Sequence, residues 1–308
     1  MRLANDEGVS KMTSELHEHD RGLIHDLNVL IGRRSALGWL TSAGVGAVAV
    51  ACFGCSESSD DSASTGTTSS SSSTASGSGS GSSGTTTGAD QCVADPSETN
   101  GPYPADGTNN ANGSLANVLI ESGIVRSDIR SSFGSLSGTA DGVELTLTIK
   151  VVDVNNSCAP LEGYAVYIWH CDAAGDYSIY NLPNQNYLRG VGVTDANGEV
   201  TFTTVFPGCY SGRWPHIHFE VYPSLAKATQ YSNRVLCSQF AMPENECTLV
   251  YNNVSTYSGS TSAYSRISIA SDNIFNDNTT AQLNQQTPTL SGSTSSGYSG
   301  QVTVGLAI

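Results

Sequence analysis

The sequence predicts an all-β fold, an antiparallel β-sandwich preceded by a signal segment and a disordered Ser/Gly/Thr tether. Runs of alternating apolar and polar residues recur beyond residue 90, as expected of strands with one buried face. Clusters of Gly, Asn, Asp, Pro and Ser separate these runs, and no comparable helical period appears there apart from a short stretch at residues 115–122. Strands at such intervals are typical of an antiparallel sandwich.

Residues 1–55 are predicted to be an export signal. Arg33 and Arg34 precede an uncharged run from residue 35 to residue 55 that is rich in Ala, Gly and Val, which is the pattern of a secretory signal. The paired arginines, with Leu37 and Leu40 behind them, resemble a twin-arginine signal. An ordinary secretion signal and an uncleaved membrane helix are the alternatives. We therefore expect an exported protein in the periplasm, at the cell surface or outside the cell.

Two cysteines near the end of this segment are candidates for lipidation. Cys52 and Cys55 each follow small or apolar residues and precede a polar stretch. Cys52 fits better, because Ala49, Val50 and Ala51 come directly before it. A lipidated cysteine at either position would anchor the protein to a membrane.

Residues 56–90 are predicted to be a flexible linker. They consist almost entirely of Ser, Thr, Gly, Ala and Asp, so they bury too little apolar surface to offset the loss of chain entropy. The folded domain is expected over residues 91–308, with folding beginning near Cys92. This length, with its supply of Val, Ile, Leu, Tyr and Phe, suffices for one sizeable core.

The charge balance argues against nucleic acid as a partner. The whole chain has a formal net charge of −15. Residues 56–308 keep 8 Lys plus Arg against 22 Asp plus Glu, and 8 − 22 gives −14. With so few basic residues and no basic cluster, binding to phosphate groups of nucleic acid or to an anionic membrane surface is disfavoured.

Six cysteines remain beyond the signal, and an even number in an exported chain predicts disulfides rather than a zinc cluster. Cys237 and Cys247 bracket a polar loop and are the favoured pair. The other pairings stay open among the remaining cysteines, which are Cys92, Cys158, Cys171 and Cys209.

Residues 143–151 alternate without a break, with Val and Leu or Ile on one face and Glu, Thr and Lys on the other. This pattern predicts a half-buried strand. Similar runs predict further strands at residues 164–169, 199–206, 216–222, 264–270 and 301–308. Residues 195–198 resemble a fragment of a calcium loop, but a turn between strands is the better interpretation. The Ser/Thr/Asn/Gly-rich tail at residues 255–299 is predicted to form long loops.

The segment from Pro207 to His218 predicts a metal site. His216 and His218 are two residues apart on a predicted strand, so both imidazoles point to one face. Two neutral imidazoles suit zinc, copper or iron, and a phenolate ligand favours Fe(III) among them. Tyr210 lies six residues before His216, and Tyr177 is the candidate for a second phenolate.

Other interpretations of these residues stay open. Tyr180 and Tyr187 compete with Tyr177 for the role of second phenolate. A strand that carries two surface histidines is the alternative to a metal site. His170, at the end of a predicted strand, is interpreted as structural.

The order of several motifs resembles that of the intradiol ring-cleavage dioxygenases, which include the catechol and protocatechuate dioxygenases. The resemblance runs from about Cys92 to Gln230. Its motifs are Asn100-Gly101-Pro102-Tyr103, Trp169-His170 with Gly175-Asp176-Tyr177, Arg189-Gly190, Thr194 to Gly198, and Pro207 to His218.

The resemblance implies a catechol-type aromatic substrate, O2 and a non-haem Fe(III). The ring would open between the two hydroxyl-bearing carbons and give a muconate-type product. The implied metal ligands are Tyr177, Tyr210, His216 and His218. The tyrosine that aligns with Tyr210 leaves the metal when substrate binds and can take a substrate proton.

The resemblance also assigns residues around the substrate. Arg213 would face the ring carbon that O2 attacks, and Gln230 would help to orient it. The alternative role for Arg213 is an ion pair with an acidic loop. Pro102 and Tyr103 would line the substrate pocket. Two rival hypotheses are an iron-binding sandwich without turnover and a non-metal surface binding module.

Overall fold

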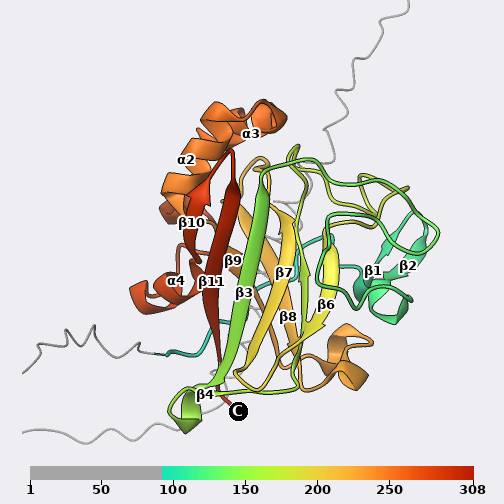
Figure 1. Cartoon of the computed structure of the whole chain (residues 1–308), viewed down its shortest axis with the longest axis vertical. Helices are drawn as coiled ribbons and strands as arrows, with labels where there is room; N and C mark the ends of the chain where they lie inside the picture. The colour runs from blue at the N-terminus through green and yellow to red at the C-terminus, as the bar shows by residue number, and fades with distance from the viewer. Residues whose placement is uncertain (1–91) are drawn as a thin grey trace, which may run out of the picture. The chain divides into compact units, whose positions relative to one another are not determined.

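Two facing β-sheets form a sandwich in a computed structural model, which describes residues 92–308 (Figure 1). The first sheet has the order β10-β11-β3-β4, with β7 paired to β3, and the second has the order β6-β5-β8-β9. A separate hairpin consists of β1 and β2. The sequence-based prediction of an all-β sandwich is therefore confirmed. The predicted signal at residues 1–55 and the linker at residues 56–90 lie outside the described residues.

The strands are β1 (Asp106–Ala111), β2 (Ser114–Asn117), β3 (Glu144–Asp153), β4 (Ala159–Pro160), β5 (Ala165–Trp169), β6 (Arg189–Val193), β7 (Glu199–Val205), β8 (His216–Tyr222), β9 (Leu236–Ala241), β10 (Thr289–Ser293) and β11 (Gly297–Leu306). The α-helices are α2 (Glu244–Asn253), α3 (Ser258–Tyr264) and α4 (Thr280–Gln286). The 3₁₀ turns are η1 (Val118–Ile120), η2 (Val154–Asn156), η3 (Leu225–Lys227), η4 (Tyr231–Asn233), η5 (Ser255–Tyr257) and η6 (Ile269–Ser271).

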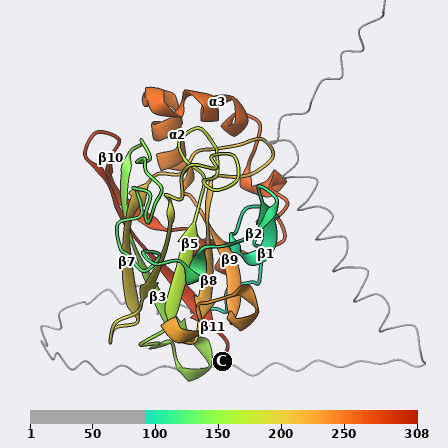
Figure 2. The ribbon, with the colours of Figure 1, turned by 90° about the vertical axis from the view of Figure 1, so that its right-hand side faces the viewer.

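The main hydrophobic core lies between the two sheets, which Figure 2 shows as separate layers. The buried residues of β3 alternate in the sequence, so one face of the strand packs inward and the other carries its polar residues. The core residues of β8 follow the same period, namely Ile217, Phe219 and Val221. Most strand pairs are antiparallel, but β11 runs parallel to β3.

The alternating runs found in the sequence form β3, β5, β7, β8 and β11, so these five predicted strands are confirmed. The strand predicted at residues 264–270 is wrong. The chain there leaves α3 and turns into η6. Ile267 and Ile269 pack against a side cluster that contains Trp214, and Ile267 also packs against the main core without joining either sheet. The predicted loop region at residues 255–299 contains α3, α4 and β10.

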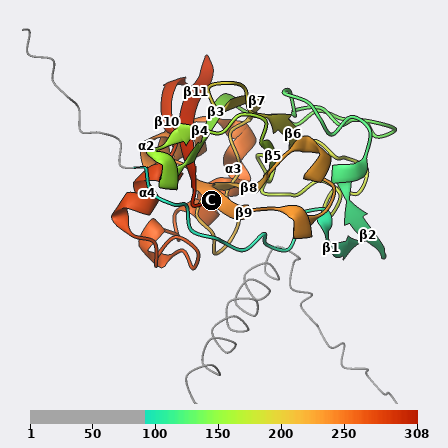
Figure 3. The ribbon, with the colours of Figure 1, turned by 90° about the horizontal axis from the view of Figure 1, so that it is seen from below.

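Other segments of the chain cover the outer face of the second sheet, so this face does not meet solvent. Tyr167 and Trp169 of β5 and Tyr222 of β8 pack there in a second cluster. Residues around the β1–β2 hairpin and η1 complete this cluster. Figure 3 shows the hairpin at one side of the described domain and α4 at the other. All seven residues of β8 are consequently buried.

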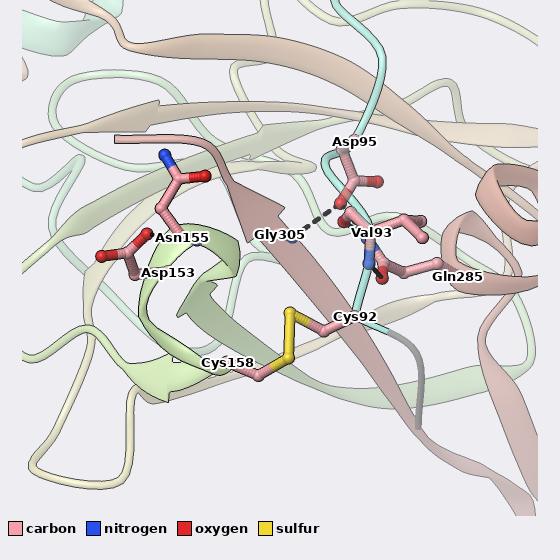
Figure 4. The surroundings of a disulfide bond; sticks show 8 residues. All are labelled: Cys92, Val93, Asp95, Asp153, Asn155, Cys158, Gln285 and Gly305. Atoms are coloured by element: carbon pink, nitrogen blue, oxygen red, sulfur yellow. Dashed lines mark hydrogen bonds between the residues drawn. A yellow bond between two sulfur atoms is a disulfide. The ribbon is translucent and has the colours of Figure 1, made fainter. Parts of the chain in front are cut away.

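A disulfide joins Cys92, the first described residue, to Cys158 in the loop after β3 (Figure 4). The predicted pair Cys237–Cys247 does not form. Cys247 lies in the core between the sheets, whereas Cys237 is absent from that core because it alternates with Leu236, which does pack there. The two thiols therefore point to different sides of the second sheet.

Hydrogen bonds hold the segment that follows Cys92 in place (Figure 4). The backbone N–H of Val93 donates to the side chain of Gln285 in α4 at 2.9 Å. The Asp95 carboxylate accepts from the Gly305 N–H in β11 at 2.7 Å and from Gln285 at 2.6 Å. We call residues 92–105 the N-terminal strap, since they run along the domain before β1.

Within residues 92–308, no helix is both long enough and apolar enough to cross a membrane.

Removal of the disulfide should lower the free energy of unfolding. The cross-link spans 66 residues, and closing a loop of that length in the unfolded chain is worth roughly 2–4 kcal/mol. We expect Cys92→Ser with Cys158→Ser to lower the Tm by roughly 5–15 °C in calorimetry. A matched control is Cys237→Ser, which breaks no disulfide. An unchanged Tm in the double variant would show that the cross-link adds nothing to stability.

Candidate metal centre

The two histidines of β8 face the covered outer side of the second sheet. His216 and His218 are each 2% exposed, on the strand face opposite to Ile217. In the sheet, His218 is paired with Trp169 of β5 and with Gln239 of β9. The Trp169 ring stacks on the His218 ring at 4.8 Å between centroids and an angle of 4°. The imidazole of His218 is thus fixed by both its strand and its neighbour.

Two loops bring tyrosines to these histidines, and glycines allow the loops to touch. The Gly208 N–H donates to the Asp172 carbonyl at 3.0 Å, and a Cβ at residue 208 would lie only 2.3 Å from that oxygen. Gly175 has a φ of +95°, and a Cβ there would lie 3.3 Å from the Cβ of Tyr210. The close packing places the rings of Tyr177 and Tyr210 at 5.9 Å between centroids.

Four polar side chains converge where β8 meets these loops. The Tyr210 hydroxyl and the His216 Nε2 are 3.1 Å apart, and the two Nε2 atoms of His216 and His218 are also 3.1 Å apart. The Tyr177 ring lies 6.3 Å from the His218 ring. Its hydroxyl is buried and has no hydrogen-bond partner among the described residues.

Both imidazoles are neutral and can offer a lone pair. The Nδ1 of His216 lies 2.5 Å from the Trp214 carbonyl, which only accepts, so Nδ1 carries the proton and Nε2 carries the lone pair. Burial, together with the charge of Arg213, lowers the pKa of His216 to about 3. Burial and the neighbouring His216 hold the pKa of His218 well below its usual value.

These residues fit a metal ion. Two nitrogens that each lie about 2.1 Å from one ion, roughly at right angles, are about 3.0 Å apart, close to the observed 3.1 Å. Without a cation, the single lone pair of His216 Nε2 would have to accept hydrogen bonds from both the Tyr210 hydroxyl and His218 Nε2. Burial raises the pKa of Tyr177 well above its usual value, and a bound cation would reverse this by stabilising the phenolate.

The donor set depends on phenol oxygens. Among residues 92–308, no group of three or more His, Cys, Asp and Glu side chains is arranged to hold a metal. A metal bound by His216 and His218 would therefore take Tyr177 and Tyr210 as further ligands. Oxygen and imidazole donors without thiolate are a harder set than that of most structural zinc sites.

The two competing tyrosines are engaged elsewhere. The Tyr180 hydroxyl donates to Asn109 at 2.6 Å and accepts from the Ala105 N–H at 2.9 Å. The Tyr187 hydroxyl donates to Asp172 at 3.1 Å. Tyr177 is thus the tyrosine of this loop whose ring contacts His218 and Tyr210.

His170 lies on a different side of the loop, where it has a structural role. Its Nε2 lies 2.7 Å from the Thr204 hydroxyl in β7, and its Nδ1 lies 2.7 Å from the Cys171 carbonyl. Both nitrogens are therefore used within the fold, and burial lowers the pKa of His170 to about 4.

Arg213 is buried beside the histidines. It forms an ion pair with a loop carboxylate, as the alternative interpretation expected, but it does not contact the predicted Gln230. Its Nη2 donates to the Gln239 side chain at 2.6 Å, and its Nε donates to Asp272 at 3.0 Å. Gln230 is exposed at the start of η4 and is not brought to the site. Gln239 faces the site because it is paired with His218 across β8 and β9. Sequence reasoning missed Gln239 because residues 236–241 are buried on both faces and show no apolar–polar alternation.

Asp272 was also missed, because it lies in the tail that was predicted to be loop. Its Oδ2 accepts from Arg213 Nε and from the Trp214 N–H at 2.6 Å. Its Oδ1 accepts from the N–H groups of Ile274 and Phe275 at 2.8 and 3.1 Å. Burial alone would raise the pKa of Asp272, but the Arg213 charge and these N–H groups outweigh it and lower the pKa.

The N-terminal strap forms a wall beside Tyr177. The Tyr103 ring lies 5.0 Å from the rings of both Tyr177 and Tyr180. Pro102, the residue before it, is half-buried. That Pro102 and Tyr103 line a substrate pocket stays a prediction.

Arg189 holds this wall to the rest of the site. Its five N–H donors make five hydrogen bonds, all to protein oxygens. These are the carbonyls of Tyr103 and Pro104 in the strap, the hydroxyl and carbonyl of Ser178, and the Tyr167 hydroxyl. Ser178 directly follows Tyr177, so one buried guanidinium connects the strap to the loop that carries the second tyrosine.

Comparison with protein families gives one match to this part of the chain. A family model described as Dioxygenase matches residues 128–229, a range that contains Tyr177, Tyr210, Arg213, His216 and His218. The comparison with curated proteins finds no match.

Two solved structures are similar over most of the described domain. An intradiol ring-cleavage dioxygenase from Tetranychus urticae is 27% identical with a TM-score of 0.50, covering 70% of this chain and 94% of that chain. A second dioxygenase structure is also 27% identical, with a TM-score of 0.51 and the same coverage.

Proposed function

Because the folded domain is related to the intradiol ring-cleavage dioxygenases, we propose that this chain is an Fe(III)-dependent enzyme that opens catechol-type rings. The family relationship supports a ring-cleaving dioxygenase. The observation that carries the metal and the substrate class is the buried cluster of two phenols and two neutral imidazoles. Tyr177, Tyr210, His216 and His218 would hold the metal.

The two phenols differ in burial, and this suggests different roles. Tyr177 is 1% exposed, whereas Tyr210 is half-buried at the edge of the site. Tyr210 can therefore move away from the metal position and accept a proton at its oxygen when an ortho-dihydroxy ring enters. Tyr177 stays in place against Tyr103. A bound ferric ion would hold the two substrate oxygens and draw electron density from the ring, so that the ring reacts with O2.

Arg213 would act electrostatically on the reacting ring. It is buried and close enough to His216 for its charge to lower the pKa of that imidazole. A fixed cation in a site that excludes water stabilises developing negative charge more than the same cation does in bulk water. Its hydrogen bonds to Asp272 and Gln239 hold the guanidinium in one orientation.

The distribution of basic residues favours a substrate whose ring carries no carboxylate. Residues 92–308 contain eight Lys and Arg, and of these only Arg189 and Arg213 are buried. Arg189 gives all its donors to protein oxygens, and Arg213 shares its charge with Asp272. A carboxylate on the substrate would then lose its hydration without gaining a cation, which is costly.

We also propose that the protein is exported, with lipid anchoring at Cys52 or Cys55. The paired Arg33 and Arg34 support this, and so does the Cys92–Cys158 disulfide, since such bonds persist mainly in oxidising compartments.

Removal of one imidazole should remove the metal. We expect the full chain to bind about one iron and to show a tyrosinate-to-iron absorption band that shifts when a catechol is added. His218→Ala should lose the iron, the band and turnover, because a site with three ligands binds far more weakly. His170→Gln is the control, since it also replaces a buried histidine but should keep the band.

Metal analysis and visible spectroscopy check this prediction. Iron and turnover retained by His218→Ala would refute the proposed ligand set. Wild-type protein with iron but without a catechol-induced shift would indicate an iron-binding sandwich without turnover, and colourless protein would indicate a non-metal binding module.

The charge of the substrate should decide how well it is used. We expect kcat/KM for catechol and methylcatechol to exceed that for a dihydroxybenzoate by at least about 10- to 100-fold, because even an uncharged polar group left unpaired in a buried site costs about 1–3 kcal/mol and a charge costs more. Oxygen uptake with each ring measures this ratio. Equal or better use of the carboxylated ring would contradict a preference for uncharged rings.

Export should depend on the paired arginines. In cell fractionation, the full chain should leave the cytoplasm, whereas a variant with Arg33→Lys and Arg34→Lys should accumulate inside. Retention of the wild-type chain in the cytoplasm would disprove export. Equal export of both forms would rule out the twin-arginine route.

A further inference from the structure

The orientation of Arg213 depends on a carboxylate from a distant part of the sequence. Arg213 lies in the loop between β7 and β8, 59 residues before Asp272, and no sheet pairing fixes its backbone. Its guanidinium lies between Gln239 and Asp272, with bonds of 2.6 and 3.0 Å. Gln239 is itself held, because its Nε2 donates to the Thr99 carbonyl in the N-terminal strap at 3.0 Å.

Asp272 is built into the fold as a fixed acceptor. It is fully buried, and its Oδ1 accepts from the Ile274 and Phe275 N–H groups of its own loop. Phe275 packs in a side cluster with Trp214 and Ala241. The carboxylate is therefore in place before any substrate binds, and its Oδ2 faces Arg213 and the Trp214 N–H.

The loop anchored by Asp272 also leads to a histidine. The Trp214 N–H donates to Asp272 at 2.6 Å, and the carbonyl of the same residue accepts from His216 Nδ1 at 2.5 Å. One carboxylate thus fixes the short segment from Arg213 to Trp214 at both a side chain and a backbone group.

We propose that Asp272 is a positioning residue, which holds the Arg213 guanidinium in the orientation that the reaction needs. This inference rests on the proposed function. It assigns a role in catalysis to the tail beyond residue 255, which the sequence motifs do not reach.

The hydrogen-bond pattern explains why the residue is aspartate and not asparagine. All four groups that point at its two oxygens are donors. An asparagine would replace one oxygen by an NH2 group, which would then face two donors in either orientation. Asp272→Asn therefore keeps the size of the side chain but must break two of the four bonds.

Steady-state kinetics and metal analysis give the first test. Asp272→Asn should keep about one iron and its absorption band, with kcat lowered by about 10- to 100-fold, because misplacement of a catalytic group by about 1 Å can have an effect of this size. Asp141→Asn, an exposed carboxylate outside the site, should leave kcat unchanged. An unchanged kcat in Asp272→Asn would overturn the proposal.

A double-mutant cycle shows whether Asp272 acts through Arg213. If it does, adding Asp272→Asn to Arg213→Ala should lower kcat by less than twofold beyond Arg213→Ala alone. An equal loss in both backgrounds would show that the carboxylate acts on something else and would overturn the proposal.

Arg213→Lys keeps the test valid if Asp272→Asn does not fold. Lysine retains the positive charge but cannot reach Asp272 and Gln239 in the same fork geometry. Positioning predicts a kcat close to that of Arg213→Ala, whereas near-wild-type kcat would mean that charge alone suffices.

A measurement without turnover separates this inference from the proposed function. In protein labelled with ¹⁵N-arginine and loaded with diamagnetic Ga(III) in place of iron, the Arg213 Nε–H should exchange slowly with water, and Arg213→Ala identifies its signal. Asp272→Asn should speed this exchange at least tenfold, and unchanged exchange would overturn the proposal. Wild-type protein that opens no catechol, yet shows this protection, would defeat only the proposed function.

Discussion

Burial of both faces of β8 is the constraint on which the site depends. One face supplies Ile217, Phe219 and Val221 to the core between the sheets. The other face carries His216 and His218, and these are buried only because chain from other parts of the sequence covers them. A strand in an ordinary sandwich would present this second face to water, where histidines would be protonated in mild acid and mobile.

Burial also sets the chemistry of the side chains. It keeps the imidazoles neutral and would keep an isolated phenol protonated. A metal ion changes the balance, since a cation can be held by groups that are too buried to carry charge of their own. The same burial demands that every nearby charge have a partner, and Arg213 with Asp272 satisfies this demand within the protein.

The sequence predicted the parts of the fold in which apolar and polar residues alternate clearly and the contacts are local. The alternation of β3 and β8 predicted both a buried face and the shared direction of the two histidines. The sequence did not predict partners that are distant along the chain and are brought together only by the fold. Gln239 comes from a strand whose residues are buried on both faces and thus lack alternation, and Asp272 comes from a Ser- and Asn-rich tail.

Gln230 looked suitable in the sequence, but it lies exposed before η4. The disulfide was missed because Cys92 and Cys158 are far apart along the chain and adjacent only when β3 and the strap are folded.

The attachment of the strap has a mechanical consequence. The strap is cross-linked at Cys92, bonded to Gln285 and Gly305 through Val93 and Asp95, and only then continues to Thr99 and Tyr103. Tension applied from residues before Cys92 is therefore borne by a covalent bond to the loop after β3. The segment that contacts Gln239 and Tyr177 lies beyond this anchor. The cross-link at Cys92 therefore shields the wall of the site from force applied to the chain before it.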